Sequence, residues 1–220
     1  MRIEIVSLWA GGSDEISVGF ELREGENVCA QKFLIPTEVY TALALQKGEC
    51  GGEVYDTVER EAQIYAAYKR GLYILGYGAC SKNMLTSKLV AKGVDKGHAR
   101  AAVERICARG FINEGECARR EAEICLSKLW GVSRIKAHLI QKKYSVEAVD
   151  LALFALEDMG VDFDENCKRA ISGRYKKIPT DRVEMQKLVA AICRLGYSVS
   201  QIKSACVALK EERKRDIYSS

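Results

Sequence analysis

Proline, histidine and long apolar runs are scarce in this sequence of 220 residues. It holds two prolines and two histidines, and no Cys-x-x-Cys pair occurs among its nine cysteines. Because metal ligands at the usual spacing are missing, the sequence predicts no metal site and no cofactor. No window of about 18 residues is uniformly apolar, so we expect no membrane-spanning helix. The N-terminus lacks the pattern of a secretion signal, and we therefore expect a cytoplasmic protein with reduced thiols.

The net charge of +4 conceals two regions of opposite sign. Residues 1–58 hold four Lys/Arg and ten Asp/Glu, a balance of −6, whereas residues 59–220 hold 30 and 20, a balance of +10. A basic helical region suits an anionic partner, either nucleic acid or an acidic protein surface. A solvated helical surface that happens to be basic explains the composition equally well.

The first 55 residues predict a small β-rich segment. In "ISVGFEL" apolar and small or polar residues alternate, as they do in a strand with one buried face. Residues 2–22 are predicted to form a hairpin around the turn "GGSDE", and "VCAQKFLI" to form a third strand that stops at Pro36. A short helix from Thr37 to about Gln46 completes this α/β segment.

From Asp56 onward the sequence predicts helices alone. One proline, Pro179, remains in this region, and apolar residues recur every three or four positions. Asp56 and Glu59 resemble a capping box, which would start a helix spanning residues 59–75.

A register of about fifty residues recurs within the helical region. Aligning Gly93, Lys143 and Gly196 brings three candidate helix N-caps into coincidence, namely Asp95, Ser145 and Ser198. The same apolar stripe follows each of the three caps.

The sequence therefore predicts a mainly α protein of three tandem three-helix repeats in an elongated or curved array, behind the β-rich segment. The segment is expected to span residues 1–55 and the repeats residues 56–110, 111–160 and 161–220. The helices of the repeats are expected at residues 59–75, 82–92, 95–109, 113–128, 132–143, 145–159, 162–173, 181–195 and 198–212.

Two stretches of this helical region resemble a known family. "AYKRGLYILGYGACSKNMLTSKLVAKGV", followed by "AVERICARGFINEGECAR", is similar to the RecX family of bacterial RecA regulators. The pattern runs through Arg70–Leu75, the cap Ser81, the helix end Lys88–Gly93 and the joint Gly110–Glu114. "WGVSRIKAHLIQKKYS" continues the likeness, except that Lys143 and Tyr144 replace a glycine and an aliphatic residue.

The resemblance covers residues 1–160 well, and it implies regulation without chemistry. RecX proteins bind along the groove of the RecA filament on single-stranded DNA and block its ATP turnover and strand exchange. The resemblance thus predicts a protein that is not an enzyme, whose partner is the RecA filament, with weak direct DNA binding from its positive surface. We expect a monomer.

Gly93, Lys143 and Gly196 mark the joints between the second and third helices of the three repeats. The basic residues beside the first two of these joints are the candidate partner-binding residues. They are Lys82, Lys88, Lys92, Lys96 and Arg100 around the first joint, and Arg134, Lys136, Lys142 and Lys143 around the second. Any one of them can equally be a solvated charge, so the prediction concerns the cluster. Arg70, Arg119 and Arg120 can instead be structural partners of Glu104, Glu121 or Glu123.

Other candidate groups have a structural explanation that we favour. Four tyrosines could stack on bases, but their helical spacing favours packing: Tyr65, Tyr68, Tyr73 and Tyr77. Trp130 is expected to fill a gap between repeats. "GYG" at residues 76–78 lacks the third glycine of a phosphate loop. Four acidic residues could hold a divalent ion, but helix capping explains them: Asp158, Asp162, Asp164 and Glu165.

Two other functional hypotheses stay open beside RecA regulation. In a direct DNA-binding module, the third helix of a repeat would enter a major groove. "GHARAAVERICARG" is basic enough for this role, but "VEAVDLALFALEDMG" is apolar and acidic. A helical scaffold with an unrelated partner is also compatible with tandem repeats.

Overall fold

The computed structural model describes residues 1–12 and 14–218, and it divides into two compact units. Unit 1 comprises residues 1–79 and 85–111, and unit 2 comprises residues 80–84 and the chain from residue 112 onward. Ser13 in the predicted turn and residues 219–220 of the last predicted repeat lie outside the described residues. Within the described chain, no helix has both the length and the apolar character needed to cross a membrane.

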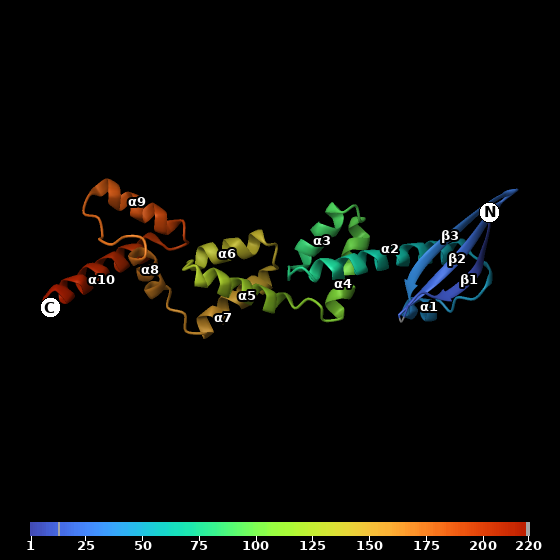
Figure 1. Ribbon diagram of the computed structural model, residues 1–220, viewed down its shortest axis with the longest axis horizontal. Helices are drawn as coiled ribbons and strands as arrows, with labels where there is room; N and C mark the ends of the chain where they lie inside the picture. The colour runs from blue at the N-terminus through green and yellow to red at the C-terminus, as the bar shows by residue number, and fades with distance from the viewer. Residues whose placement is uncertain (13, 219–220) are drawn as a thin grey trace. The chain divides into compact units, whose positions relative to one another are not determined.

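Unit 1 begins with a four-stranded antiparallel sheet of order β3-β2-β1-β4. Its strands are β1 (Arg2–Ala10), β2 (Glu15–Glu24), β3 (Asn27–Pro36) and β4 (Gly48–Cys50), and Figure 1 shows them at the N-terminal end. The three predicted strands are present. The short β4, which pairs with Ile3–Ile5, was not predicted, because the three residues Gly-Glu-Cys are too few to show an alternating strand pattern.

Helix α1 lies between strands β3 and β4 in the chain, and helix α2 follows β4. α1 (Thr37–Ala42) ends before the predicted Gln46, since Ala44 adopts a left-handed φ of 46°. α2 (Gly52–Leu75) begins seven residues before the predicted residue 59, so the capping-box prediction for Asp56 and Glu59 is wrong. Packing explains the earlier start, because the first turns of α2 bury Tyr55 against Phe20 of the sheet, with ring centroids 5.2 Å apart.

The second half of α2 packs against α4 (Lys96–Ala108), and Leu85 and Leu89 of α3 (Lys82–Ala91) lie beside Gly71 of α2. Leu89 and Ile106 are fully buried in this core. Gly71 of α2 allows the close approach, because a Cβ there would lie 2.5 Å from the Ile106 Cδ1 atom.

Unit 2 holds two helix triplets (Figure 1). Each triplet has its own apolar core. The first triplet is α5 (Glu114–Ser127), α6 (Val132–Gln141) and α7 (Val146–Asp158). The second is α8 (Phe163–Ser172), α9 (Arg182–Cys193) and α10 (Val199–Tyr218). The mainly α fold class is confirmed, as is the small N-terminal sheet.

The three aligned joints share a backbone conformation. Gly93, Lys143 and Gly196 all have positive φ angles, of 84°, 60° and 94°. The residue that ends each joint caps the next helix: Asp95 accepts from the Gly97 amide, and its counterparts Ser145 and Ser198 accept from Ala148 and Gln201. These features support the proposed three-repeat organisation, and its four-part boundaries remain a proposal.

Ser81 ties the start of α3 to the α6–α7 joint within unit 2. Its hydroxyl donates to the Lys142 carbonyl over 2.8 Å and accepts from the Met84 amide over 3.2 Å, and the residue is 1% exposed. We expect Ser81→Ala to lower the free energy of unfolding by about 1–3 kcal/mol, because the Lys142 carbonyl and the Met84 amide each lose a hydrogen-bond partner. Urea unfolding followed by circular dichroism measures this loss.

Ser172→Ala is the matched control for Ser81→Ala. The exposed Ser172 hydroxyl donates to the Lys168 carbonyl one turn earlier on the same helix, so its removal should leave stability nearly unchanged. Equal unfolding midpoints for the two variants would show that the Ser81 bonds contribute nothing.

Candidate partner-binding site

Four predicted partner-binding residues form an exposed basic surface in unit 1. Lys88 lies in the last turn of α3, Lys92 follows this helix, and Lys96 and Arg100 lie one turn apart on α4. All four are exposed, and within the described residues their side chains have no ion pair or hydrogen bond. We call these four residues the Gly93 surface, since Gly93 makes the turn between the two helices.

Asp95, an acidic residue beside this surface, hydrogen-bonds to the backbone. Its carboxylate accepts from the amides of Gly97 over 2.7 Å and His98 over 3.1 Å. The hydrogen bonds from the amides of His98 and Gly97 lower the pKa of Asp95. The carboxylate therefore caps α4 and leaves the neighbouring cations free for a partner.

A hollow of about 320 Å³ adjoins the Gly93 surface within unit 1. α2 contributes the exposed Arg70 to its lining, and the joint contributes Gly93, Asp95 and His98. Arg70, for which a structural role was also considered, thus lies beside the Gly93 surface. Arg119 has the structural role, since it pairs with Glu116 over 3.0 Å and with Glu123 over 2.8 Å.

The basic residues of unit 2 are engaged in the fold. Lys136 lies 3.8 Å from Asp150, and Lys142 lies 3.5 Å from Glu121. The Lys143 carbonyl accepts from the Asn83 side chain, and the Lys82 amide donates to Glu114. The backbones of Lys82 and Lys143 thus help to hold the start of α3 in unit 2. Partner contact by these side chains remains a prediction.

Arg134 joins the two helix triplets of unit 2. Its guanidinium lies over the Trp130 ring, 3.9 Å from the centroid, and donates to the Arg194 carbonyl over 2.9 Å. Trp130 is half-buried and packs against both apolar cores, as expected for a residue that fills the gap between them. Arg134 therefore has a structural role that its sequence position does not indicate.

The change Arg134→Lys tests that structural role at constant charge. We expect the free energy of unfolding to fall by about 1 kcal/mol, because lysine loses the flat stacking surface and the directed hydrogen bond. Thermal unfolding measures the loss. Arg182→Lys, at an exposed position in α9, should leave the unfolding midpoint unchanged, and an equal shift in both variants would contradict the role of Arg134.

The four candidate tyrosines divide into two pairs. Tyr65 and Tyr68 stack with ring centroids 6.1 Å apart, and Tyr68 is buried, so they pack within unit 1 as expected. Burial and the hydrogen bond to Glu15 raise the pKa of Tyr65 to about 12. Tyr73 and Tyr77 are exposed by 68% and 78%, and their hydroxyls lie 2.5 Å apart. This exposed pair keeps the base-stacking hypothesis open.

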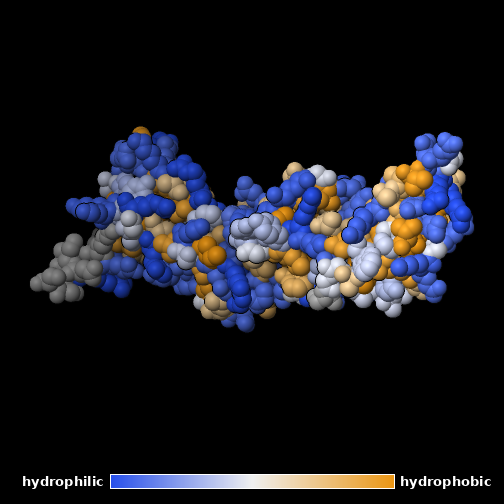
Figure 2. Space-filling model, turned by 45° about the vertical axis from the view of Figure 1, so that its right-hand side comes forward, coloured by the Kyte–Doolittle hydropathy of each residue, from blue (hydrophilic) through white to orange (hydrophobic). Residues whose placement is uncertain are grey.

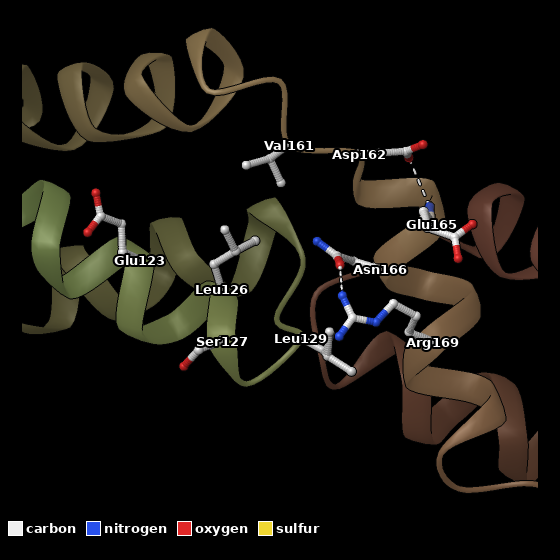
Figure 3. A pocket seen from close by; sticks show the side chains of 9 residues that line it. All are labelled: Glu123, Leu126, Ser127, Leu129, Val161, Asp162, Glu165, Asn166 and Arg169. Atoms are coloured by element: carbon white, nitrogen blue, oxygen red, sulfur yellow. Dashed lines mark hydrogen bonds between the residues drawn. The ribbon is translucent and has the colours of Figure 1, made fainter.

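The acidic residues at the junction of α7 and α8 cap a helix. Asp162 accepts from the amides of Asp164 and Glu165, and Gln201 donates to Asp164. Figure 3 shows the hollow of about 410 Å³ that this junction borders, with Asp162 bonded to the Glu165 amide and Arg169 directed at Asn166. Capping therefore explains Asp162.

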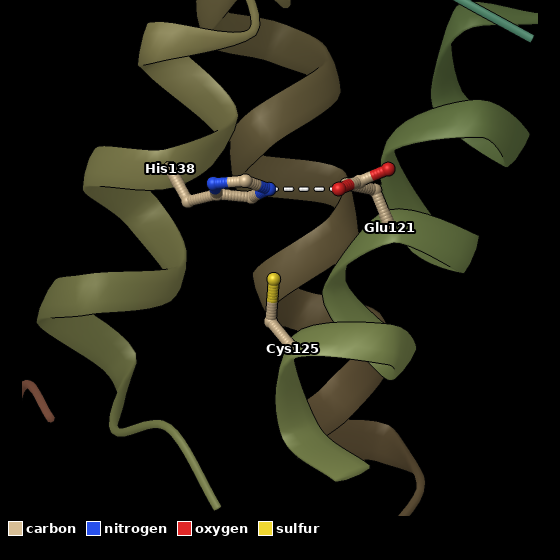
Figure 4. A group of neighbouring side chains, drawn as sticks. All are labelled: Glu121, Cys125 and His138. Carbon is tan, nitrogen blue, oxygen red and sulfur yellow. Dashed lines mark hydrogen bonds and ion pairs between the residues drawn. The ribbon is translucent and has the colours of Figure 1, made fainter. Parts of the chain in front are cut away.

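One group of potential metal ligands was missed by sequence reasoning. Glu121 and Cys125 of α5 and His138 of α6 lie side by side in unit 2 (Figure 4). In the sequence, His138 has no Cys or Asp at the usual spacing of metal ligands. The Glu121–Cys125 spacing of four residues was the available signal, since it places both side chains on one helix face.

The comparisons with curated proteins find regulatory proteins, although no family model matches the chain. "Regulatory protein RecX" of Xanthomonas axonopodis pv. citri is 28% identical over 138 residues, which cover 62% of this chain and 83% of that protein. The protein of the same name from Halorhodospira halophila is 25% identical over 161 residues, which cover 73% of this chain and 98% of the relative.

Solved structures of this group share the fold. The crystal structure of a regulatory protein RecX covers 92% of this chain with a TM-score of 0.70 and 19% identity. That of RecX from Lactobacillus salivarius covers 67% of this chain with a TM-score of 0.57 and 18% identity. The matched residues make up 99% and 97% of the two solved chains. The resemblance to the RecX family that the sequence predicts is confirmed.

Proposed function

We propose, from the confirmed resemblance to the RecX family, that this protein regulates RecA by binding its filament on single-stranded DNA. Binding lowers ATP hydrolysis and strand exchange. The observation that carries the proposal is the Gly93 surface, four exposed cations without partners in the described chain, on a fold shared with RecX proteins. The protein acts by occupying the filament and carries out no chemistry of its own.

The electrostatics of the Gly93 surface suit such a partner. A filament on DNA offers phosphates and acidic protein side chains, and exposed cations steer the encounter with both. Each contact on an exposed surface contributes about 0.2–1 kcal/mol, so a single site binds weakly. Repeats that contact successive protomers of one filament raise the overall affinity through effective concentration.

Titration of RecA ATP hydrolysis tests the proposal. The protein is added in substoichiometric amounts to RecA from the same organism on single-stranded DNA, and ATP turnover is recorded. We expect inhibition well below one protein per RecA, since one bound protein perturbs several protomers. Unchanged turnover at equimolar protein would overturn the proposed function.

Direct DNA binding is the second candidate, and the same free cations favour it. The exposed faces of the third helices argue against a DNA recognition helix in every repeat, because these faces differ in character. α4 exposes Lys96 and Arg100, whereas α7 exposes Leu151 and Phe154, by 61% and 64%. Tight and salt-sensitive binding to DNA, with no effect on ATP turnover by RecA, would favour this candidate.

A further inference from the structure

We propose that Glu121, Cys125 and His138 form a binding site for a divalent transition-metal ion of the zinc type. The carboxylate, the thiol sulfur and a ring nitrogen of these residues lie within 4.8 Å of one another. Figure 4 shows the three side chains converging between α5 and α6. The site lies wholly within unit 2 and does not depend on the proposed function.

The backbone holds the three side chains in place. Glu121 and Cys125 are four residues apart on α5, so they project from one face of the helix, while His138 comes from the neighbouring helix α6. Fully buried residues adjoin the site on both helices, with Ala122 on α5 and Leu139 on α6. The separation of the ligands is thus set by a packed core.

The donor atoms are those that zinc prefers. Thiolate sulfur, imidazole nitrogen and carboxylate oxygen are its common protein ligands, and two of them carry charges that offset the two charges of the ion. Ligand atoms around tetrahedral zinc lie about 3.3–3.6 Å apart, given bond lengths of about 2.0–2.3 Å. The Glu121 Oε1 and His138 Nε2 atoms lie 2.7 Å apart, so small side-chain rotations suffice to admit the ion.

The surroundings leave one side of the site open. Cys125 is fully buried, whereas the side chains of His138 and Glu121 are 22% and 23% exposed. An ion can therefore enter from the solvent side and keep a water as its fourth ligand. The Trp130 and His138 rings pack perpendicular to each other, with centroids 5.3 Å apart, and this contact restricts the orientation of His138.

A bound ion has to displace two interactions that Glu121 makes in the metal-free site. The hydrogen bond between His138 and Glu121 and the Lys142 ammonium 3.5 Å from Glu121 hold the site without metal. On binding, the Cys125 thiol releases its proton to solvent, and the thiolate and the imidazole take up the ion without any change of oxidation state. Because the ion links α5 to α6, it stabilises unit 2 through linkage.

Cobalt(II), a spectroscopic substitute for zinc, tests the site. The full chain is treated with a chelator, kept reduced and titrated with Co²⁺. We expect one ion per chain, a thiolate-to-cobalt charge-transfer band in the near ultraviolet, and a higher unfolding temperature. Zinc should abolish the band by displacing cobalt.

Variants assign the band to its ligands. Cys125→Ser should abolish it and raise the Kd for cobalt at least about tenfold, and His138→Gln should raise the Kd similarly. Cys117→Ser, which changes a half-buried cysteine elsewhere on α5, should leave the band intact. If Cys125→Ser fails to fold, His138→Gln decides alone, because its side chain is partly exposed. The absence of the band in the unaltered chain, or unchanged affinity in His138→Gln, would overturn the proposal.

Discussion

Inhibition of RecA ATP hydrolysis should be lost when the four charges of the Gly93 surface are reversed. We expect the concentration of the Lys88→Glu/Lys92→Glu/Lys96→Glu/Arg100→Glu variant needed for half-inhibition to rise about 100-fold or more, since attraction becomes repulsion at four positions. Because these side chains have no ion pairs within the described residues, the fold should be retained. The ATPase titration measures the change, and circular dichroism checks the helix content.

A second variant with the same change in charge distinguishes the local effect of the Gly93 surface from the effect of the protein's net charge. Four exposed lysines of the α8–α10 triplet can be reversed in the same way: Lys176, Lys177, Lys203 and Lys210. We expect this variant to inhibit within about threefold of the unaltered protein at 0.15 M salt, where charges far from a contact are screened. Equal losses in the two variants would show that net charge decides binding, and no loss in either would remove the Gly93 surface from the account.

The second large effect concerns stability. Gly131→Ala should lower the free energy of unfolding of unit 2 by about 3 kcal/mol, because overpacking against rigid backbone costs this much. A Cβ at residue 131 would lie 2.5 Å from the Gly196 carbonyl oxygen and 2.7 Å from its carbon. The Gly131 amide also donates to the Leu195 carbonyl over 2.7 Å, so a shift that relieves the clash would lengthen this bond.

Gly115→Ala is the control for the change at Gly131. A Cβ at residue 115, within α5, would meet only ordinary contacts, 3.7 Å from Asn113 and 3.9 Å from Leu151. Alanine is the better helix former, so we expect a gain of up to about 1 kcal/mol. Denaturant unfolding compares the two variants. A Gly131→Ala protein as stable as the control would show that the two triplets do not meet at these glycines.

The helices from α3 onward were predictable because local signals agree with the packing. Each of the aligned caps Asp95, Ser145 and Ser198 begins a helix at the following residue, and buried residues follow the predicted apolar stripe. The earlier start of α2 was not predictable, because Gly51 and Gly52 carry no helix signal. Contact with the sheet through Tyr55 extends that helix.

The candidate site was predictable only in part. Position beside a joint marks Lys88, Lys92 and similar residues as candidates, but it does not reveal which cations the fold already uses. Arg134 and Lys92 are both basic residues near a joint, so the sequence does not distinguish their roles. The structure does, because it places the Arg134 guanidinium over the Trp130 ring. The group of Glu121, Cys125 and His138 likewise depends on how α5 faces α6, which their spacing in the sequence does not determine.

The surface of unit 1 and unit 2 drawn in Figure 2 is covered mostly by hydrophilic residues, with apolar residues in small groups among them. Such a face favours a charged partner over a broad apolar one.

Binding of the labelled protein to preformed RecA filaments on single-stranded DNA, compared with bare DNA of the same length and salt, tests the central claim most directly. Fluorescence anisotropy gives both dissociation constants. We expect the filament to be bound at least about tenfold more tightly, a difference of about 1.4 kcal/mol. Equal or tighter binding to bare DNA would contradict filament regulation and establish DNA as the partner.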